Sequence, residues 1–107
     1  MTRVVYDSSD FTLTMDGHAR SGIIGEDLVC SALSMLMYTL EAALTDHKEA
    51  LLPSIGKADG HARFHCSPTK GNKTMCKTIF ATIFSGFELL ANQYPQNVTA
   101  IKREQEG

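Results

Sequence analysis

The chain has 107 residues, of which 43% are hydrophobic and 21% are charged, and its formal net charge is −2. These values are typical of a folded globular domain and exclude a chain that is disordered throughout. We expect a single domain over residues 1–107, because this length suits one hydrophobic core. The Lys and Arg residues are scattered between Arg3 and Arg103, which argues against a nucleic-acid-binding surface, since such a surface needs clustered basic residues.

The N-terminus lacks the pattern of an export signal. Asp7, Asp10 and Asp16 interrupt it where a signal peptide would carry an apolar run. We expect no segment that is long and apolar enough to span a bilayer, and therefore no membrane partner. The three cysteines are an odd number, which argues against a disulfide framework.

The first sixteen residues predict a β-hairpin. Residues 2–7 are rich in β-branched and aromatic side chains, and residues 8–10 form a turn signal. Phe11, Leu13 and Met15 then alternate with polar residues. This period of two is typical of a half-buried strand.

The next segment is expected to be a mobile loop. Gly17, Gly22 and Gly25 punctuate it, and glycine reaches backbone conformations that other residues avoid. Ile23 and Ile24 are apolar residues inside this loop. They either pack on the core or cover a site.

A long amphipathic helix is predicted to follow, with its start at Glu26 and Asp27 and its end around residues 46–48. Its apolar residues have helical spacing. They are Leu28, Val29, Ala32, Leu33, Leu36, Met37, Leu40, Ala43 and Leu44.

The remaining elements follow from the same criteria. Pro53, Gly56 and Gly60 predict a loop over residues 51–60. Then come a strand over the alternating residues 61–66, a second amphipathic helix from about 72 to 92, and a last strand over 98–102. Pro95 closes the second helix, because it cannot continue the helical ladder.

The expected order is therefore strand, strand, helix, strand, helix, strand. This order indicates an α+β fold, in which both helices pack on one face of a small mixed sheet.

Cys30 has the position of a nucleophile. It falls just outside the apolar stripe of the first helix, about 110° from its centre at 100° per residue, and the expected helix start places it in the first turn. Unpaired N–H groups and the helix dipole favour negative charge there, and the thiolate is the reactive form of cysteine. Cys66 is expected to be a small buried hydrophobe, and Cys76 has a weaker claim to reactivity.

A thiol nucleophile needs a base, and histidine is the usual one. His18 opens the glycine-rich loop that leads into the Cys30 helix. A lone loop histidine is more often solvated, and the spacing alone leaves both interpretations open.

The runs at residues 15–19 and 27–32, which contain His18 and Cys30, resemble the ribosomal-processing cysteine protease family, Prp. The pattern of that family is Gly-His-Ala, a short loop with glycine, then Gly-x-Asp-Ile-Val-Cys and a Ser four residues on. The matching residues of the second part are Gly25, Asp27, Cys30 and Ser34, with Leu28 in place of the commoner Ile. The specific motif covers residues 15–34 only.

The resemblance implies a His18–Cys30 dyad, a homodimer and a cytoplasmic setting. It also implies a substrate, the N-terminal extension of a large-subunit ribosomal protein (the twenty-seventh in the usual naming), from which the family removes a short segment that ends in paired aromatics. No cofactor and no metal are expected.

The supporting residues have two interpretations each. Asp27 either orients His18 or caps the helix, and capping is favoured because N-caps prefer Asp. Ser34 either donates a hydrogen bond near the thiolate or is an ordinary surface serine. The N–H groups at the helix start are the natural oxyanion donors.

Two alternatives remain at this point. His61, His65, Cys66 and Cys76 offer four metal ligands, but without the short paired spacings of a zinc site. The other alternative is a non-catalytic module with the same fold that binds the ribosome or another protein.

Overall fold

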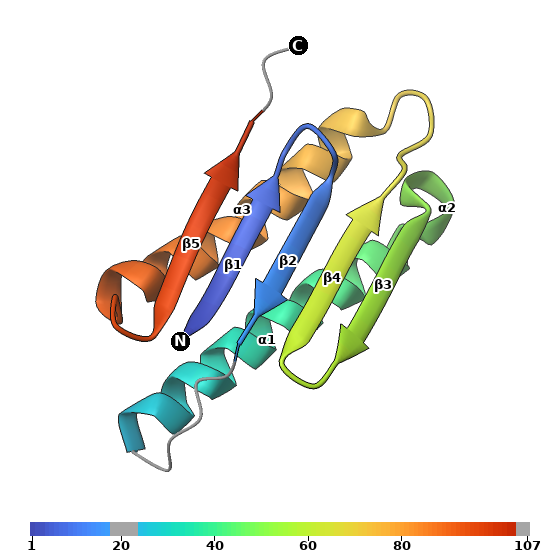
Figure 1. The fold of residues 1–107 in the computed structure, drawn as a ribbon. Helices are drawn as coiled ribbons and strands as arrows, with labels where there is room; N and C mark the ends of the chain where they lie inside the picture. Colours follow the sequence, from blue (N-terminus) through green and yellow to red (C-terminus); the bar gives the residue numbers. More distant parts are fainter. Residues whose placement is uncertain (18–23, 105–107) are drawn as a thin grey trace.

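The computed structural model describes the backbone of residues 1–17 and 24–104, and the side chains of residues 1–17 and 28–104. In chain order the elements are β1 (Thr2–Asp7), β2 (Thr12–Asp16), α1 (Ile24–Asp46), α2 (Lys48–Leu51), β3 (Pro53–Ala58), β4 (His61–Cys66), α3 (Lys73–Gln93) and β5 (Val98–Arg103). The strands form one sheet in the order β3-β4-β2-β1-β5 (Figure 1).

The sheet is mixed. β1 pairs parallel with β5, whereas the other neighbouring strands are antiparallel. The long helices α1 and α3 cross the same face of the sheet (Figure 1). The predicted α+β class, with two helices on one face, is confirmed.

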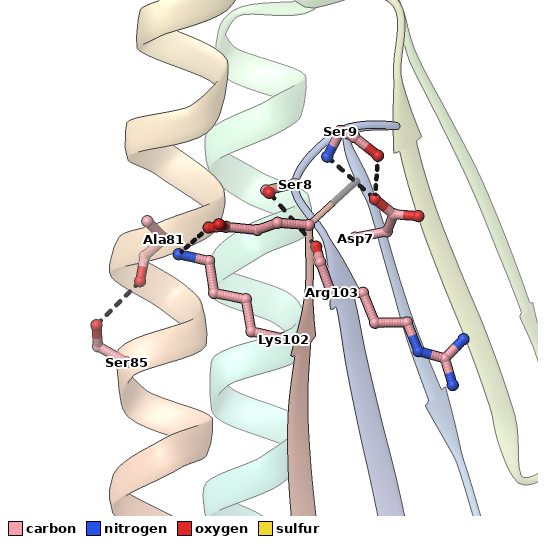
Figure 2. Close-up of polar contacts among 8 residues, drawn as sticks. Asp7, Ser8, Ser9, Ala81, Ser85, Lys102 and Arg103 are labelled. Carbon is pink, nitrogen blue, oxygen red and sulfur yellow. Dashed lines mark hydrogen bonds and ion pairs between the residues drawn. The ribbon is translucent and has the colours of Figure 1, made fainter. Parts of the chain in front are cut away.

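The β1–β2 hairpin follows the period-two pattern of its sequence. Val4 lies opposite Met15 and Tyr6 opposite Leu13, so both strands turn their apolar residues toward the helices. At the hairpin turn the Ser9 N–H and hydroxyl donate to the Asp7 carboxylate at 3.0 and 2.6 Å (Figure 2). The neighbouring Ser8 N–H donates to the carbonyl of Arg103 in β5 at 3.0 Å, so this end of the sheet is tied together.

The core fills the space between the sheet and the helices. Tyr6 of β1 stacks on Phe80 of α3 with ring centres 5.5 Å apart. The largest fully buried side chains are Tyr6, Phe64, Phe80, Phe87, Leu13, Leu40, Leu44 and Leu51. Leu28 departs from the predicted apolar stripe of α1, because 62% of its surface is exposed.

The predicted loop over residues 51–60 is wrong. Within it, Pro53–Ala58 form the edge strand β3, which pairs with β4. A short helix α2 and a left-handed residue, Leu52 (φ 48°), turn the chain into this strand. The strand was missed because Ile55 and Pro53 are its only apolar-facing residues of any size and Gly56 weakens the strand signal.

From the sequence we expect no segment long and apolar enough to span a bilayer, and by these two criteria the expectation is wrong. Two helical stretches in the described residues, Leu28–Asp46 and Lys73–Gln93, are long and apolar enough. Core helices of soluble proteins meet the same criteria, so this is weak evidence for a membrane span. Phe80 and Phe87 of the second stretch are fully buried in the core.

Candidate active site

Cys30 lies on the side of α1 that faces one end of the sheet. It is half-buried and packs against the core, whereas its neighbour Val29 is fully buried. The predicted position at the boundary between core and solvent is confirmed. A thiol there has one side supported by apolar packing and another side open to a ligand.

The predicted start of the helix is wrong. α1 begins at Ile24, so Ile24 and Gly25 belong to the helix and not to the loop. Cys30 is then the seventh residue of α1, in its second turn, and its N–H has a carbonyl four residues earlier inside the helix. Within the described part of α1, the N–H groups of residues 24–27 have no acceptor four residues earlier. Helical side chains point toward the N-terminus, so the Cys30 thiol still points toward these groups.

Asp27 is the fourth residue of α1, which excludes its interpretation as the N-cap of this helix. An acidic residue in the first turn is still favourable beside the positive end of the helix dipole. The side chain of Asp27 lies outside the described residues. His18, Gly22 and Ile23 also lie outside them, so the predicted dyad stays a prediction.

A cavity of about 280 Å³ opens between α1 and the ends of the strands, and Cys30 lines it. Ser34, one turn farther along α1, is exposed and lines the same cavity. The apolar wall is formed by Met15, Leu33, Met37 and Ala62. The structure therefore brings two of the predicted residues, Cys30 and Ser34, to one concave site.

Gly17 lines this cavity as well. Its φ is +103°, and the Cβ atom of any other residue would overlap the carbonyl oxygen of Met1. Its N–H donates to the carbonyl of Gly60 at 2.9 Å. Only glycine adopts this conformation without strain, so the residue that precedes His18 in the chain is fixed beside the cavity that Cys30 lines.

Asp16 and His61 form a polar pair at the same end of the sheet. They lie opposite each other in β2 and β4, and Nδ1 of His61 is hydrogen-bonded to the Asp16 carboxylate. His61 also lines the cavity. The pair joins the end of β2, which leads to His18 in the chain, to the start of β4.

A second polar group crosses from β3 to α1. Nζ of Lys57 donates to both carboxylate oxygens of Glu41, at 2.9 and 2.8 Å. These hydrogen bonds raise the pKa of Lys57 above its ordinary value. The same ammonium lies 5.2 Å from the ring centre of Tyr38. Lys57 and Tyr38 both line the cavity.

Cys66 and Cys76 differ sharply from Cys30. Both belong to the core, with 1% and 0% of their surface exposed. The hydrogen bond to Cys76, together with burial, raises the pKa of the Cys66 thiol. The prediction that Cys66 is a small buried hydrophobe is confirmed.

The residues considered as possible metal ligands do not lie around one point. His61 and His65 lie on the face of β4 opposite to that of the buried Cys66. In the part of the chain that the structure describes, no three His, Cys, Asp or Glu side chains could hold a metal ion together.

A family model described as "Cysteine protease Prp" matches residues 1–99. The chain belongs to the Prp family. A curated relative, the ribosomal processing cysteine protease Prp of Staphylococcus aureus, is 27% identical over 85 residues, which are 78% of this chain and 78% of the relative. Like these Prp proteins, the chain is a cysteine protease.

Solved structures show the same fold. SMU.848 from Streptococcus mutans has a TM-score of 0.71 and 26% identity, with 97% of this chain and 93% of that chain covered. The S. aureus protease Prp in complex with a covalently linked product peptide has a TM-score of 0.79 and 22% identity, with 96% and 100% covered. A second structure of that protease holds a substrate peptide and has a TM-score of 0.77.

Sequence reasoning missed Tyr38, Lys57 and His61 as residues that line the cavity. One signal was available, because Cys30, Ser34 and Tyr38 are spaced by four residues and therefore share one face of α1. Lys57 was hidden by the missed strand β3. The contribution of His61 depends on the β2–β4 register, which the sequence does not reveal.

Proposed function

We propose that this protease is an endopeptidase that removes the short N-terminal extension of a large-subunit ribosomal protein, the twenty-seventh in the usual naming. Cys30 is the nucleophile and His18 the general base. The observation that carries the proposal is that Cys30 and Gly17, the residue before His18, line one cavity. The spacing of the motif around His18 and Cys30 and the name of the S. aureus relative support it.

The chemistry divides into two displacements. Sγ of Cys30 attacks the carbonyl carbon of the scissile peptide bond, after its proton has passed to His18. His18 then gives that proton to the leaving amine, and a thioester remains on Cys30. Attack by water, with His18 again as the base, releases the acid and restores the thiol.

The tetrahedral intermediate needs donors for its negative oxygen. The N–H groups of residues 24–27 have no acceptor four residues earlier in the described part of α1, and they carry the positive end of the helix dipole. Such preformed donors usually make the largest contribution to acyl-transfer catalysis. Ser34 lines the cavity one turn after Cys30 and supplies a further hydroxyl for the bound peptide.

The shape of the site fits an extended peptide with large apolar side chains. The cavity is open, and its wall of Met15, Leu33 and Met37 is apolar. This apolar wall can contact the paired aromatic side chains of the substrate near the scissile bond. Gly22 and Ile23 lie outside the described residues, and their role as substrate-contacting residues is proposed from the motif alone.

The decisive experiment is cleavage of the purified ribosomal protein with its extension, with the product identified by mass spectrometry. His18→Ala and Cys30→Ala are each expected to lose turnover by at least about a thousandfold. His47→Ala is the matched control, because His47 is exposed at the α1–α2 junction and is expected to keep full activity. Cleavage at the wild-type rate by His18→Ala would remove His18 from the mechanism.

We propose further that the protein is a homodimer with two-fold symmetry and acts in the cytoplasm. Both helices cover one face of the sheet, and the other face and the edges β3 and β5 are available to a second copy. Light scattering at micromolar concentration is expected to give twice the chain mass, and a monomer mass would contradict the dimer. Cell fractionation tests the compartment, and recovery in the membrane fraction would contradict it.

A further inference from the structure

The wall of the cavity contains a cluster that the dyad does not use. Tyr38 and Glu41 lie on α1, and Lys57 reaches them from β3. Lys57 holds both oxygens of Glu41 and lies over the Tyr38 ring, 5.2 Å from its centre. The Lys57–Glu41 ion pair holds the edge strand β3 against α1. The contact with Lys57 holds the Tyr38 ring in the cavity wall.

The Tyr38 ring is available to a ligand. It lines the cavity, and 55% of its surface is exposed. The charge of Lys57 is matched by Glu41 at 2.8 Å, and the neighbouring wall residues Leu33 and Met37 are apolar. This part of the cavity therefore suits a large apolar side chain, which covers the exposed ring and the apolar wall, better than a carboxylate, for which the nearby cation Lys57 is already paired.

The helix gives the distance between this cluster and the reacting atoms. Tyr38 follows Cys30 by two turns of α1, which is about 12 Å at 1.5 Å per residue. An extended peptide advances about 3.3 Å per residue. A side chain beside Tyr38 therefore belongs to a residue about three to four positions from the scissile bond, beyond the residues at the cut itself.

We propose that Tyr38, held by Lys57 and Glu41, is a specificity-determining residue that binds a large apolar side chain, best an aromatic one, three to four residues from the cut. This inference rests on the proposed function, because the scissile bond is placed at Cys30. It adds a second selection step, since the enzyme then recognises a remote residue as well as those beside the bond.

The test uses peptides of the ribosomal extension in which one residue, three or four positions from the cut on either side, is Phe, Ala or Asp. For the wild type, kcat/KM is expected to fall by about tenfold or more from Phe to Ala at one of these positions, mainly through KM. In Tyr38→Ala the ratio is expected to drop below about twofold, whereas Tyr38→Phe keeps it. Lys57→Met is expected to give an intermediate ratio, because the ring stays but loses its support.

Met35→Ala is the matched control, since Met35 is exposed on α1 outside the cavity wall. Affinities of the same peptides for Cys30→Ala and for Cys30→Ala with Tyr38→Ala, measured by fluorescence anisotropy, test the inference without turnover. If the Phe-to-Ala ratio is unchanged by Tyr38→Ala, the inference is overturned while the proposed function stands. If the wild type cleaves none of the peptides but the affinities depend on Tyr38, the proposed function fails and the subsite stands.

Discussion

At one end of the sheet Cys30 is half-buried beside an open cavity, whereas at the other end Cys66 and Cys76 are enclosed in the core. At the end with Cys30, the cavity is also lined by Thr2, Gly17 and Gly60. The second end is closed by the β1–β2 turn and by a hydrogen bond from the Cys66 N–H to the carbonyl of Phe11 at 3.0 Å.

The difference shows that surroundings and not residue type decide what a cysteine does in this fold. The hydrogen bond between Cys66 and Cys76 raises the pKa of the Cys66 thiol, with burial adding to the rise, and lowers the pKa of Cys76, while burial by itself disfavours the thiolate of either residue. A buried thiol also has no path to a substrate. We therefore expect substitutions at the cavity end to change turnover and those at the core end to change stability.

The largest expected effect is that of Cys30→Ala on peptide cleavage. Removal of a nucleophile lowers turnover by at least about a thousandfold, while the fold is retained, because the side chain is only half-buried. Cys66→Ala is the matched control. It is expected to cleave at the wild-type rate but to lower the free energy of unfolding by about 1–2 kcal/mol through lost packing. Comparable turnover in the two variants would contradict the claim that only the cavity end takes part in catalysis.

Phe80→Ala is expected to give the largest loss of stability. Phe80 is fully buried and stacks on Tyr6, and such a truncation costs about 3–5 kcal/mol. Urea unfolding followed by circular dichroism measures the change. At temperatures where the variant is folded, its kcat should stay within about twofold of the wild type. A stable variant with poor turnover would mean that the core end takes part in catalysis.

Gly17→Ala is expected to affect both properties. The new Cβ would meet the carbonyl oxygen of Met1, and the φ of +103° is strained for alanine. A strained residue of this kind costs about 1–3 kcal/mol, and the shift of the chain before His18 lowers kcat as well. Gly71→Ala is the control, because Gly71 also has a positive φ but open space around it. If Gly17→Ala loses no more activity than Gly71→Ala, the backbone at residue 17 does not position the base.

The smallest expected effect lies at the β1–β2 turn. The hydroxyl of Ser9 lowers the pKa of Asp7 below its ordinary value of 3.8. Because the folded-state pKa is the lower one, the carboxylate stabilises the fold above the unfolded-state pKa, and this contribution is lost as the pH falls through the folded-state pKa. Asp7→Ala should cost less than about 1 kcal/mol at pH 7, since the carboxylate lies at the surface and is only partly buried.

The same variant should differ less from the wild type in strong acid than at pH 7. Thermal unfolding at both pH values measures this difference, with Glu88→Ala as an exposed control on α3. A cost that does not depend on pH would show that the turn is held by something other than the Asp7 charge.

Much of the fold could be predicted because its signals are local. Leu13 and Met15 alternate with polar neighbours, and Phe80 and Phe87 have helical spacing, so β2 and α3 are visible in the sequence. β3 is not, because Lys57 and Gly56 give no alternation and its pairing with β4 comes from tertiary structure. The start of α1 was placed too late because Gly25 argues against a helix.

The candidate site was predictable only in part. The motif identified Cys30 and Ser34, and the structure brings both to one cavity. Tyr38 and Lys57 meet there through the packing of β3 against α1, a long-range contact that no local pattern encodes. The Asp16–His61 pair depends in the same way on the register between β2 and β4.

The most direct test of the central claim is covalent labelling of the native wild-type chain by a peptide aldehyde or chloromethyl ketone derived from the ribosomal extension. Mass spectrometry of the digested adduct identifies the labelled thiol. We predict one adduct per chain, on Cys30, with Cys66 and Cys76 labelled only after unfolding. An adduct on Cys66 or Cys76 of the folded protein, with Cys30 unlabelled, would contradict the account.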